Sequence, residues 1–216
     1  MRIKNKIDWK TLSSMPGSKS LGEKKTLILD TAMKVISDDG LQSLSLTRIS
    51  KETGLSKSLI IYHYENMDKI IEDLFFFSGK MARYFIEKNY HPEHSFEQKT
   101  AAMISSLFEW VIYNKEVGEF FILMFHQSGK TPQMGEIQKY IFSNARELWE
   151  RLFLESMRYN SMEQIRILVT GIMNMITGTL IMMVSTNDTE NYEDHIITLK
   201  FNIESLLDVE LPVIEL

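Results

Sequence analysis

The sequence predicts an all-α fold, with a small N-terminal helix-turn-helix domain of three helices and a larger C-terminal helical domain. Three observations predict it. Apolar residues recur at helical spacing through the chain, and no segment shows the alternation of a strand. Residues 44–64 have the pattern of two short helices on either side of a glycine. Capping boxes at residues 95–98 and 161–164 mark two further helix starts.

The composition indicates a globular chain whose charge is unevenly distributed. The 216 residues include no cysteine, which excludes disulfides, thiolate metal sites and a cysteine nucleophile and suits a reducing cytoplasm. Residues 1–69 hold 12 Lys and Arg against 8 Asp and Glu, a net charge of +4, whereas the remainder holds 12 against 21, or −9. A basic first third on an acidic body favours a nucleic-acid-binding domain joined to a body with another role.

Residues 1–21 are predicted to form a flexible basic arm. They carry Arg2, Lys4, Lys6, Lys10 and Lys19 among small and polar residues, and they lack the apolar run of a signal peptide. Such an arm is either simply solvated or follows a DNA backbone into a minor groove.

The first long helix is expected over residues 23–39, where Ile28, Ala32 and Val35 fall on one face and Gly40 ends the helix. In the helix-turn-helix that follows, Ile49 faces the core, and Gly54 supplies the left-handed residue that ends a helix.

The second helix of the pair is predicted to begin at Lys57, with the Ser56 hydroxyl as its N-cap. A capped helix start presents free backbone N–H groups and the positive end of the helix dipole, both of which attract phosphate.

With these features in this order, residues 23–71 resemble the DNA-binding domain of the tetracycline-repressor (TetR) family of bacterial transcriptional regulators. The resemblance rests on the long helix, the glycine turn, the paired helices with their His63-Tyr64 ending, and a fourth helix opening at residues 68–71. The chain departs from the family pattern at Ile61, where a phosphate-contacting tyrosine is usual, and at Met67, where a lysine is usual.

The resemblance implies a cytoplasmic homodimer that regulates transcription, most often as a repressor. Residues 22–68 would bind double-stranded operator DNA, and residues 69–216 would form a helical ligand-binding and dimerisation domain responsive to a small hydrophobic effector. The alternatives are an amphipathic helical hairpin without a nucleic-acid role, and a helical interaction protein whose degenerate helix-turn-helix binds DNA weakly.

The expected DNA contacts follow from the cap at Ser56. Lys57, Ser58 and Tyr62 are expected to approach bases. Thr47, His63 and Lys69 are expected to hold phosphates. The full set of DNA-binding candidates is Thr47, Arg48, Ser56, Lys57, Ser58, Tyr62, His63 and Lys69.

Beyond residue 67 every segment is predicted to be helical. The expected helices cover residues 67–89, 95–114, 116–127, 132–159, 161–185 and 187–208. The fifth of these contains a long apolar run, but Arg166, Thr170 and Asn174 interrupt it, so a helix buried at a protein interface is favoured over a membrane span.

The last two helices suggest an interface. Small and apolar residues share one face of each helix; they either complete a monomeric core or, as the family resemblance implies, form the four-helix bundle of a two-fold dimer. The expected interface residues are Gly171, Met175, Gly178, Met182, Ile196, Leu199, Ile203 and Leu206.

The middle helices are rich in aromatic residues and methionine, which either fill a core or line an adaptable apolar pocket. The resemblance implies an effector pocket here, with candidates Met103, Phe108, Tyr113, Phe121, Met124, Phe125, His126, Trp149 and Asn174. No catalytic or cofactor motif is visible, and His91 and His94 flank a proline break without a third metal ligand nearby. An enzyme is therefore not expected.

Overall fold

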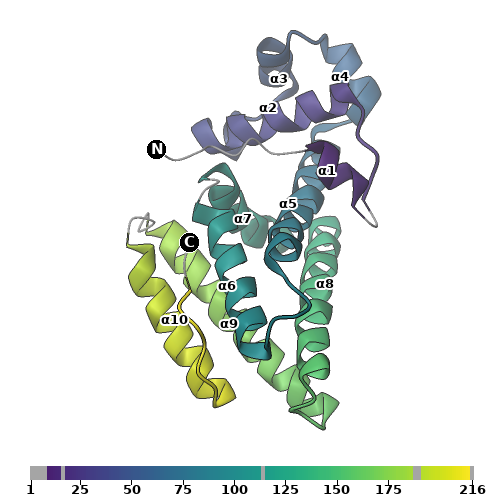
Figure 1. Cartoon of the computed structure of the whole chain (residues 1–216). Helices are drawn as coiled ribbons and strands as arrows, with labels where there is room; N and C mark the ends of the chain where they lie inside the picture. Colours follow the sequence, from purple (N-terminus) through teal and green to yellow (C-terminus); the bar gives the residue numbers. More distant parts are fainter. Residues whose placement is uncertain (1–8, 16–17, 113–114, 187–190, 215–216) are drawn as a thin grey trace. The chain divides into compact units, whose positions relative to one another are not determined.

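A computed structural model describes residues 9–15, 18–112, 115–186 and 191–214 (Figure 1). This part of the chain is helical and contains no strand, which confirms the predicted fold class. Its helices are α1 (Trp9–Ser14), α2 (Glu23–Asp39), η1 (Leu41–Ser43), α3 (Leu46–Thr53), α4 (Lys57–Tyr64), α5 (Met67–Asn89), α6 (Phe96–Ile112), α7 (Lys115–Ser128), α8 (Pro132–Ser156), α9 (Met162–Ser185) and α10 (Tyr192–Leu207).

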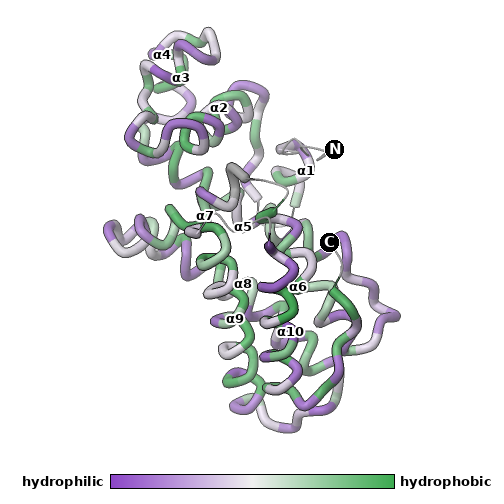
Figure 2. The backbone as a smooth tube through the Cα atoms, turned by 90° about the vertical axis from the view of Figure 1, so that its left-hand side faces the viewer, coloured by the Kyte–Doolittle hydropathy of each residue, from purple (hydrophilic) through white to green (hydrophobic). Residues whose placement is uncertain are grey.

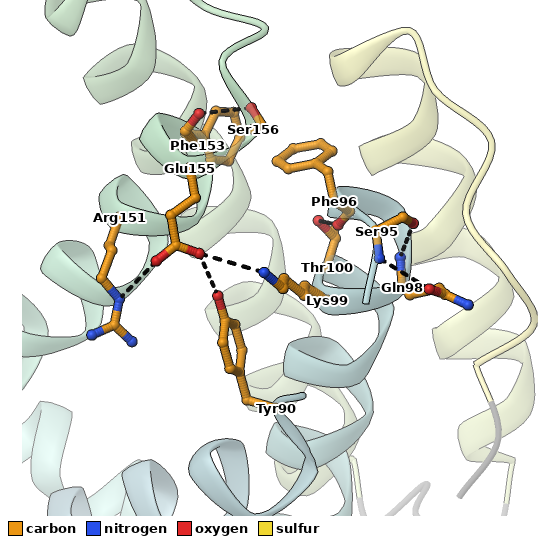
Figure 3. Close-up of polar contacts among 10 residues, drawn as sticks. All are labelled: Tyr90, Ser95, Phe96, Gln98, Lys99, Thr100, Arg151, Phe153, Glu155 and Ser156. Atoms are coloured by element: carbon orange, nitrogen blue, oxygen red, sulfur yellow. Dashed lines mark hydrogen bonds and ion pairs between the residues drawn. The ribbon is translucent and has the colours of Figure 1, made fainter. Parts of the chain in front are cut away.

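Most helix ends lie where the capping residues predict them. Ser95 and Gln98 form the predicted capping box at the start of α6: the Ser95 Oγ accepts from the Gln98 N–H at 3.2 Å, and the Gln98 Oε1 accepts from the Ser95 N–H at 3.0 Å (Figure 3). Helix α8 ends three residues earlier than expected, because Met157 adopts a positive φ of 54°. The expected start of the last helix, at residues 187–188, lies outside the described residues.

The chain divides into two compact units, and the first combines the helix-turn-helix with later helices. It comprises residues 1–81 and 113–139. Helix α7 packs on α2, where the Ser37 hydroxyl donates to Glu119 Oε2 at 3.2 Å. The Phe75 and Phe120 rings lie 4.9 Å apart between centroids. These side chains from α5 and α7 lie in the same compact unit as α2, and the domain boundary expected at residues 68 and 69 stays a prediction.

The prediction of a flexible N-terminal arm needs correction for residues 9–14. Residues 9–14 form helix α1, with Trp9 only 4% and Leu12 only 3% exposed. A six-residue helix is not stable alone, so these two buried side chains hold it in place. Residues 1–8 lie outside the described part, and the expectation for them stays a prediction.

The second unit comprises residues 82–112 and 140–216, and α9 runs alongside α10 and contacts α6 within it. Tyr90, Lys99 and Arg151 converge on Glu155 of α8 (Figure 3). The Tyr90 hydroxyl donates to Glu155 Oε2 at 2.8 Å, and this hydrogen bond lowers the pKa of the Glu155 carboxyl.

Helix α9 is hydrophobic along most of its length (Figure 2), and by length and composition alone it could cross a membrane. Its buried residues include Ile165, Val169, Ile172, Ile176 and Leu180, which form a single stripe at helical spacing. This stripe, packed with α10, is the arrangement of a core helix in a globular unit.

Candidate nucleic-acid interface

Helix α3 ends as the sequence predicts, and a serine that was not among the predicted caps precedes it. The Ser45 Oγ caps its start by accepting from the Arg48 N–H at 3.1 Å, and Ile49 is fully buried. Gly54 ends the helix in the left-handed region, with φ 71° and ψ 3°. The predicted role of this glycine is confirmed.

Polar side chains of α3 fix the turn that follows. The Ser50 hydroxyl donates to the Leu55 carbonyl at 2.6 Å. The Thr53 hydroxyl donates to the Ile49 carbonyl at 2.7 Å and accepts from the Leu55 N–H at 3.2 Å. Because the turn's own polar groups are satisfied, Leu55 can be buried at the corner between the helices.

Helix α4 presents one face to solvent. The Ser56 Oγ accepts from the Leu59 N–H at 3.2 Å, which confirms the predicted N-cap. Ile60 and Tyr64 are buried, so Ser58 and Tyr62, four residues apart, lie on the outward face. Tyr62 is 81% exposed, an unusual position for a large aromatic side chain that serves only the fold.

The other expected DNA contacts are mostly accessible. Thr47, Ser56, Lys57 and Lys69 are exposed, whereas His63 is half-buried and makes an edge contact with the Tyr62 ring, with the ring centroids 5.2 Å apart. The exposed face also includes Ile61, which was not among the expected contacts. An apolar side chain at this position can meet a thymine methyl group in a major groove.

Two of the cations expected to bind DNA are already paired with carboxylates. The Arg48 guanidinium lies 3.0 Å from Asp39 Oδ2 and 3.0 Å from Glu52 Oε1. The Lys69 Nζ lies 2.6 Å from Glu72 Oε2, and that hydrogen bond raises the pKa of Lys69. Either residue must exchange a carboxylate for a phosphate to bind DNA. Helical spacing from Arg48 to Glu52 signals this pairing in the sequence.

The effector-pocket candidates are divided between the two compact units. Met103, Phe108, Trp149 and Asn174 belong to one unit, and Phe121, Met124, Phe125 and His126 belong to the other. The buried members are Met103, Phe108, Phe121, Met124 and Trp149. Phe125 is half-buried, and Tyr113 lies outside the described residues. His126 and Asn174 are exposed, so the structure does not place them in the interior where an orienting polar group was expected.

The dimer candidates also divide into two groups. Ile196, Leu199 and Ile203 are at most 5% exposed within the single chain, because they face the core of their own unit. A Cβ added at Gly171 would lie 3.2 Å from Leu206 Cδ2, so this glycine permits contact inside the chain. Within the single chain these residues contact other helices of their own unit, and their assignment to an interface between two copies stays a prediction.

An exposed apolar face remains on the same two helices. Ile167 and Met182 of α9 and Ile197 and Phe201 of α10 are 58–67% exposed. Gly178 lies between the first two along α9, and no atom would lie within 4 Å of a Cβ added there. Large apolar side chains with this exposure, gathered on neighbouring helices, are typical of a protein interface.

Comparison with known proteins gives one match at the family level. Residues 28–74 match the family described as bacterial regulatory proteins, tetR family. This range spans most of α2, both short helices and the first turns of α5. No curated protein sequence matches the chain.

Solved structures extend the similarity over most of the chain. A transcriptional regulator from Rhodococcus sp. Rha1 has a TM-score of 0.75 at 11% identity, covering 85% of this chain and 96% of its own. The fatty acid degradation regulator FadR from Bacillus halodurans has a TM-score of 0.69 at 17% identity, covering 84% and 96%. FadR from Bacillus subtilis, in complex with stearoyl-CoA, has a TM-score of 0.66 at 16% identity, covering 81% and 96%.

Proposed function

We propose that this chain, a DNA-binding transcriptional regulator of the tetR family, is a homodimeric cytoplasmic repressor that releases its operator when a small apolar molecule binds its C-terminal helices. The family consists of regulators rather than enzymes, in agreement with the lack of a catalytic motif. The observation that carries the proposal is the exposed face of α4, with a capped start and Lys57, Ser58 and Tyr62 directed outward.

DNA recognition requires both a positive helix start and side chains that reach base edges. The Ser56 cap leaves the remaining N–H groups of the first turn and the dipole available for a phosphate. Ser58 and Tyr62 can hydrogen-bond to bases, and Ile61 can contact a thymine methyl group. We assign Thr47, Ser56 and His63 to the DNA backbone, because they flank this face and their side chains can donate hydrogen bonds to phosphate oxygens.

Dimerisation is supported by the exposed face of α9 and α10. A second copy is the natural occupant, because a DNA-binding dimer needs two recognition helices about 34–36 Å apart to reach successive major grooves. The face brings together large apolar side chains and the unobstructed Gly178, which lets a partner helix approach closely.

Effector binding is supported by composition and by one of the similar structures. The buried aromatic and methionine side chains of α6 and α8 within the second unit suit an adaptable apolar site. FadR from Bacillus subtilis was solved with stearoyl-CoA, which makes long-chain acyl compounds the first class to test. The −9 charge of residues 70–216 opposes anions at long range, so uncharged lipids and lipophilic cations form the second class.

An effector must bind one conformation of the dimer more tightly than the other, because equal affinity for both leaves the equilibrium between them unchanged. The expected result is that an apolar compound raises the melting temperature and weakens operator binding at the same concentrations. A fatty acid, its CoA thioester and a lipophilic cation of similar length form a matched series. The effector proposal is wrong if only small anions stabilise the protein, or if every stabilising compound leaves operator binding unchanged.

A second candidate function is favoured by the pairing of Arg48 and Lys69 with carboxylates and by the apolar Ile61. These features suit a helical interaction protein whose helix-turn-helix binds DNA weakly. The two candidates differ in specificity: a regulator selects one sequence from random DNA, whereas a weak binder retains only salt-sensitive, sequence-independent affinity.

A further inference from the structure

The N-terminal segment, of which residues 9–15 and 18–19 are described, contacts two helices of the first unit. The Trp9 Nε1–H donates to Asp30 Oδ1 of α2 at 3.1 Å. The same indole meets the Phe77 ring of α5 edge-on, with the ring centroids 5.8 Å apart. Trp9 thus joins the first helix of the DNA-binding domain to the helix that leaves it.

A second contact is electrostatic. Lys19 pairs with Asp73 of α5, whose side chain is only 8% exposed, and the Lys19 ammonium also lies 5.2 Å from the centroid of the Phe76 ring. A carboxylate this deeply buried is costly unless a cation compensates it. Lys19 supplies such a cation from outside the helix-turn-helix.

The last residue of the recognition helix α4 packs against α2, the helix that Trp9 contacts. Tyr64 is 3% exposed, and the Lys25 ammonium lies 5.0 Å from the centroid of its ring. Burial, together with the negative charge of Asp73, raises the pKa of the Tyr64 hydroxyl. Because α4 packs on α2, a change in how the N-terminal segment holds α2 against α5 alters the support of α4.

We infer that Lys19 is a positioning residue for DNA recognition: it neutralises Asp73 of α5, while Trp9 joins α5 to α2, on which α4 packs, so that the N-terminal segment holds α4 in its DNA-binding orientation. The inference rests on the proposed DNA-binding function. Without Lys19 the carboxylate of Asp73 lacks this cation, and the side chains around it rearrange. Helix α4 then adopts its DNA-binding orientation in a smaller fraction of the molecules. The apparent affinity for DNA falls in proportion to that fraction.

The test measures the operator affinity of two single variants in the same segment, Lys19→Met and Lys10→Met. Lys10 is exposed on α1, so its substitution removes the same charge without touching Asp73. We expect Lys19→Met to bind the operator about tenfold more weakly, as it would if the competent fraction fell to about a tenth. Lys10→Met should bind within about twofold of the unaltered chain.

Two further variants separate positioning from direct contact. Lys19→Arg should bind normally, because it keeps the cation. The double variant Lys19→Met, Asp73→Asn should recover most of the affinity, because a neutral amide no longer needs the cation. If both lysine variants lose affinity equally, or if the double variant is no better than Lys19→Met, the positioning role is wrong and Lys19 acts through its charge alone.

A measurement without DNA keeps this inference distinct from the proposed function. Amide hydrogen exchange over residues 57–64 should be faster in Lys19→Met than in Lys10→Met or the unaltered chain. Unchanged exchange in this helix overturns the inference. If the unaltered chain selects no operator, the proposed function fails, and the exchange experiment still decides whether the segment holds α4.

Discussion

Replacing Gly54 with alanine tests the helix-turn-helix turn directly. Gly54 has φ 71°, and no atom would lie within 4 Å of an added Cβ, so the cost of alanine arises from the backbone and not from a clash. A left-handed alanine costs about 1–2 kcal/mol. Alanine also lowers the conformational entropy of the unfolded chain, which offsets about 0.4–1 kcal/mol of this cost. The net loss of about 1 kcal/mol corresponds to a melting temperature lower by about 2–4 °C in a chain of this size.

The assay is chemical and thermal unfolding of three variants. Gly129→Ala is the matched control, because Gly129 is also exposed, has no positive φ, and its nearest contact for a Cβ is an ordinary 3.8 Å. It should be neutral or slightly stabilising. Gly54→Asn should lose less stability than Gly54→Ala, because asparagine tolerates the left-handed region. Equal stability of Gly54→Ala and Gly129→Ala would refute the reasoning.

Two other predictions concern the second compact unit. Gly178→Leu should sediment as a monomer, although the substitution adds about 1 kcal/mol of helix propensity to the protomer. Gly178→Ala should remain dimeric. A clean dimer from the leucine variant would place the interface elsewhere. Tyr90→Phe should raise the depressed pKa of Glu155, so the variant should be less stable than the unaltered chain near neutral pH, and the difference should shrink as acid protonates Glu155 in both. Urea unfolding of both chains, from neutral pH down to the acid range in which Glu155 is protonated, checks this prediction. A difference in unfolding free energy that does not change with pH would contradict it.

The sequence predicts the DNA-binding helices well because local chemistry determines them. The cap Ser56 and the left-handed Gly54 act within four residues of their partners, so spacing alone identifies them. The N-terminal helix was missed for the opposite reason. Its stability comes from Asp30 and Phe77, distant in sequence, and only the apolar pair Trp9 and Leu12 at helical spacing signalled it.

The face of an amphipathic helix that meets a partner chain is harder to predict. Helix α10 is apolar on two sides, and periodicity does not say which side its own chain covers. The structure buries Ile196, Leu199 and Ile203 and leaves Ile197 and Phe201 exposed. Likewise, the sequence identifies Arg48 as a cation but does not show that Asp39, nine residues away, already neutralises it.

The central claim is that the exposed face of α4 recognises a specific DNA sequence, and operator binding as a function of salt tests it most directly. A sequence selected from random DNA should bind the unaltered chain with log affinity falling linearly against log salt concentration. Lys57→Ala combined with Tyr62→Ala should lose discrimination between operator and random DNA, and its salt slope should be smaller by about one unit for the charge removed. Unchanged affinity and slope in the double variant would contradict the assignment of α4 as the recognition helix.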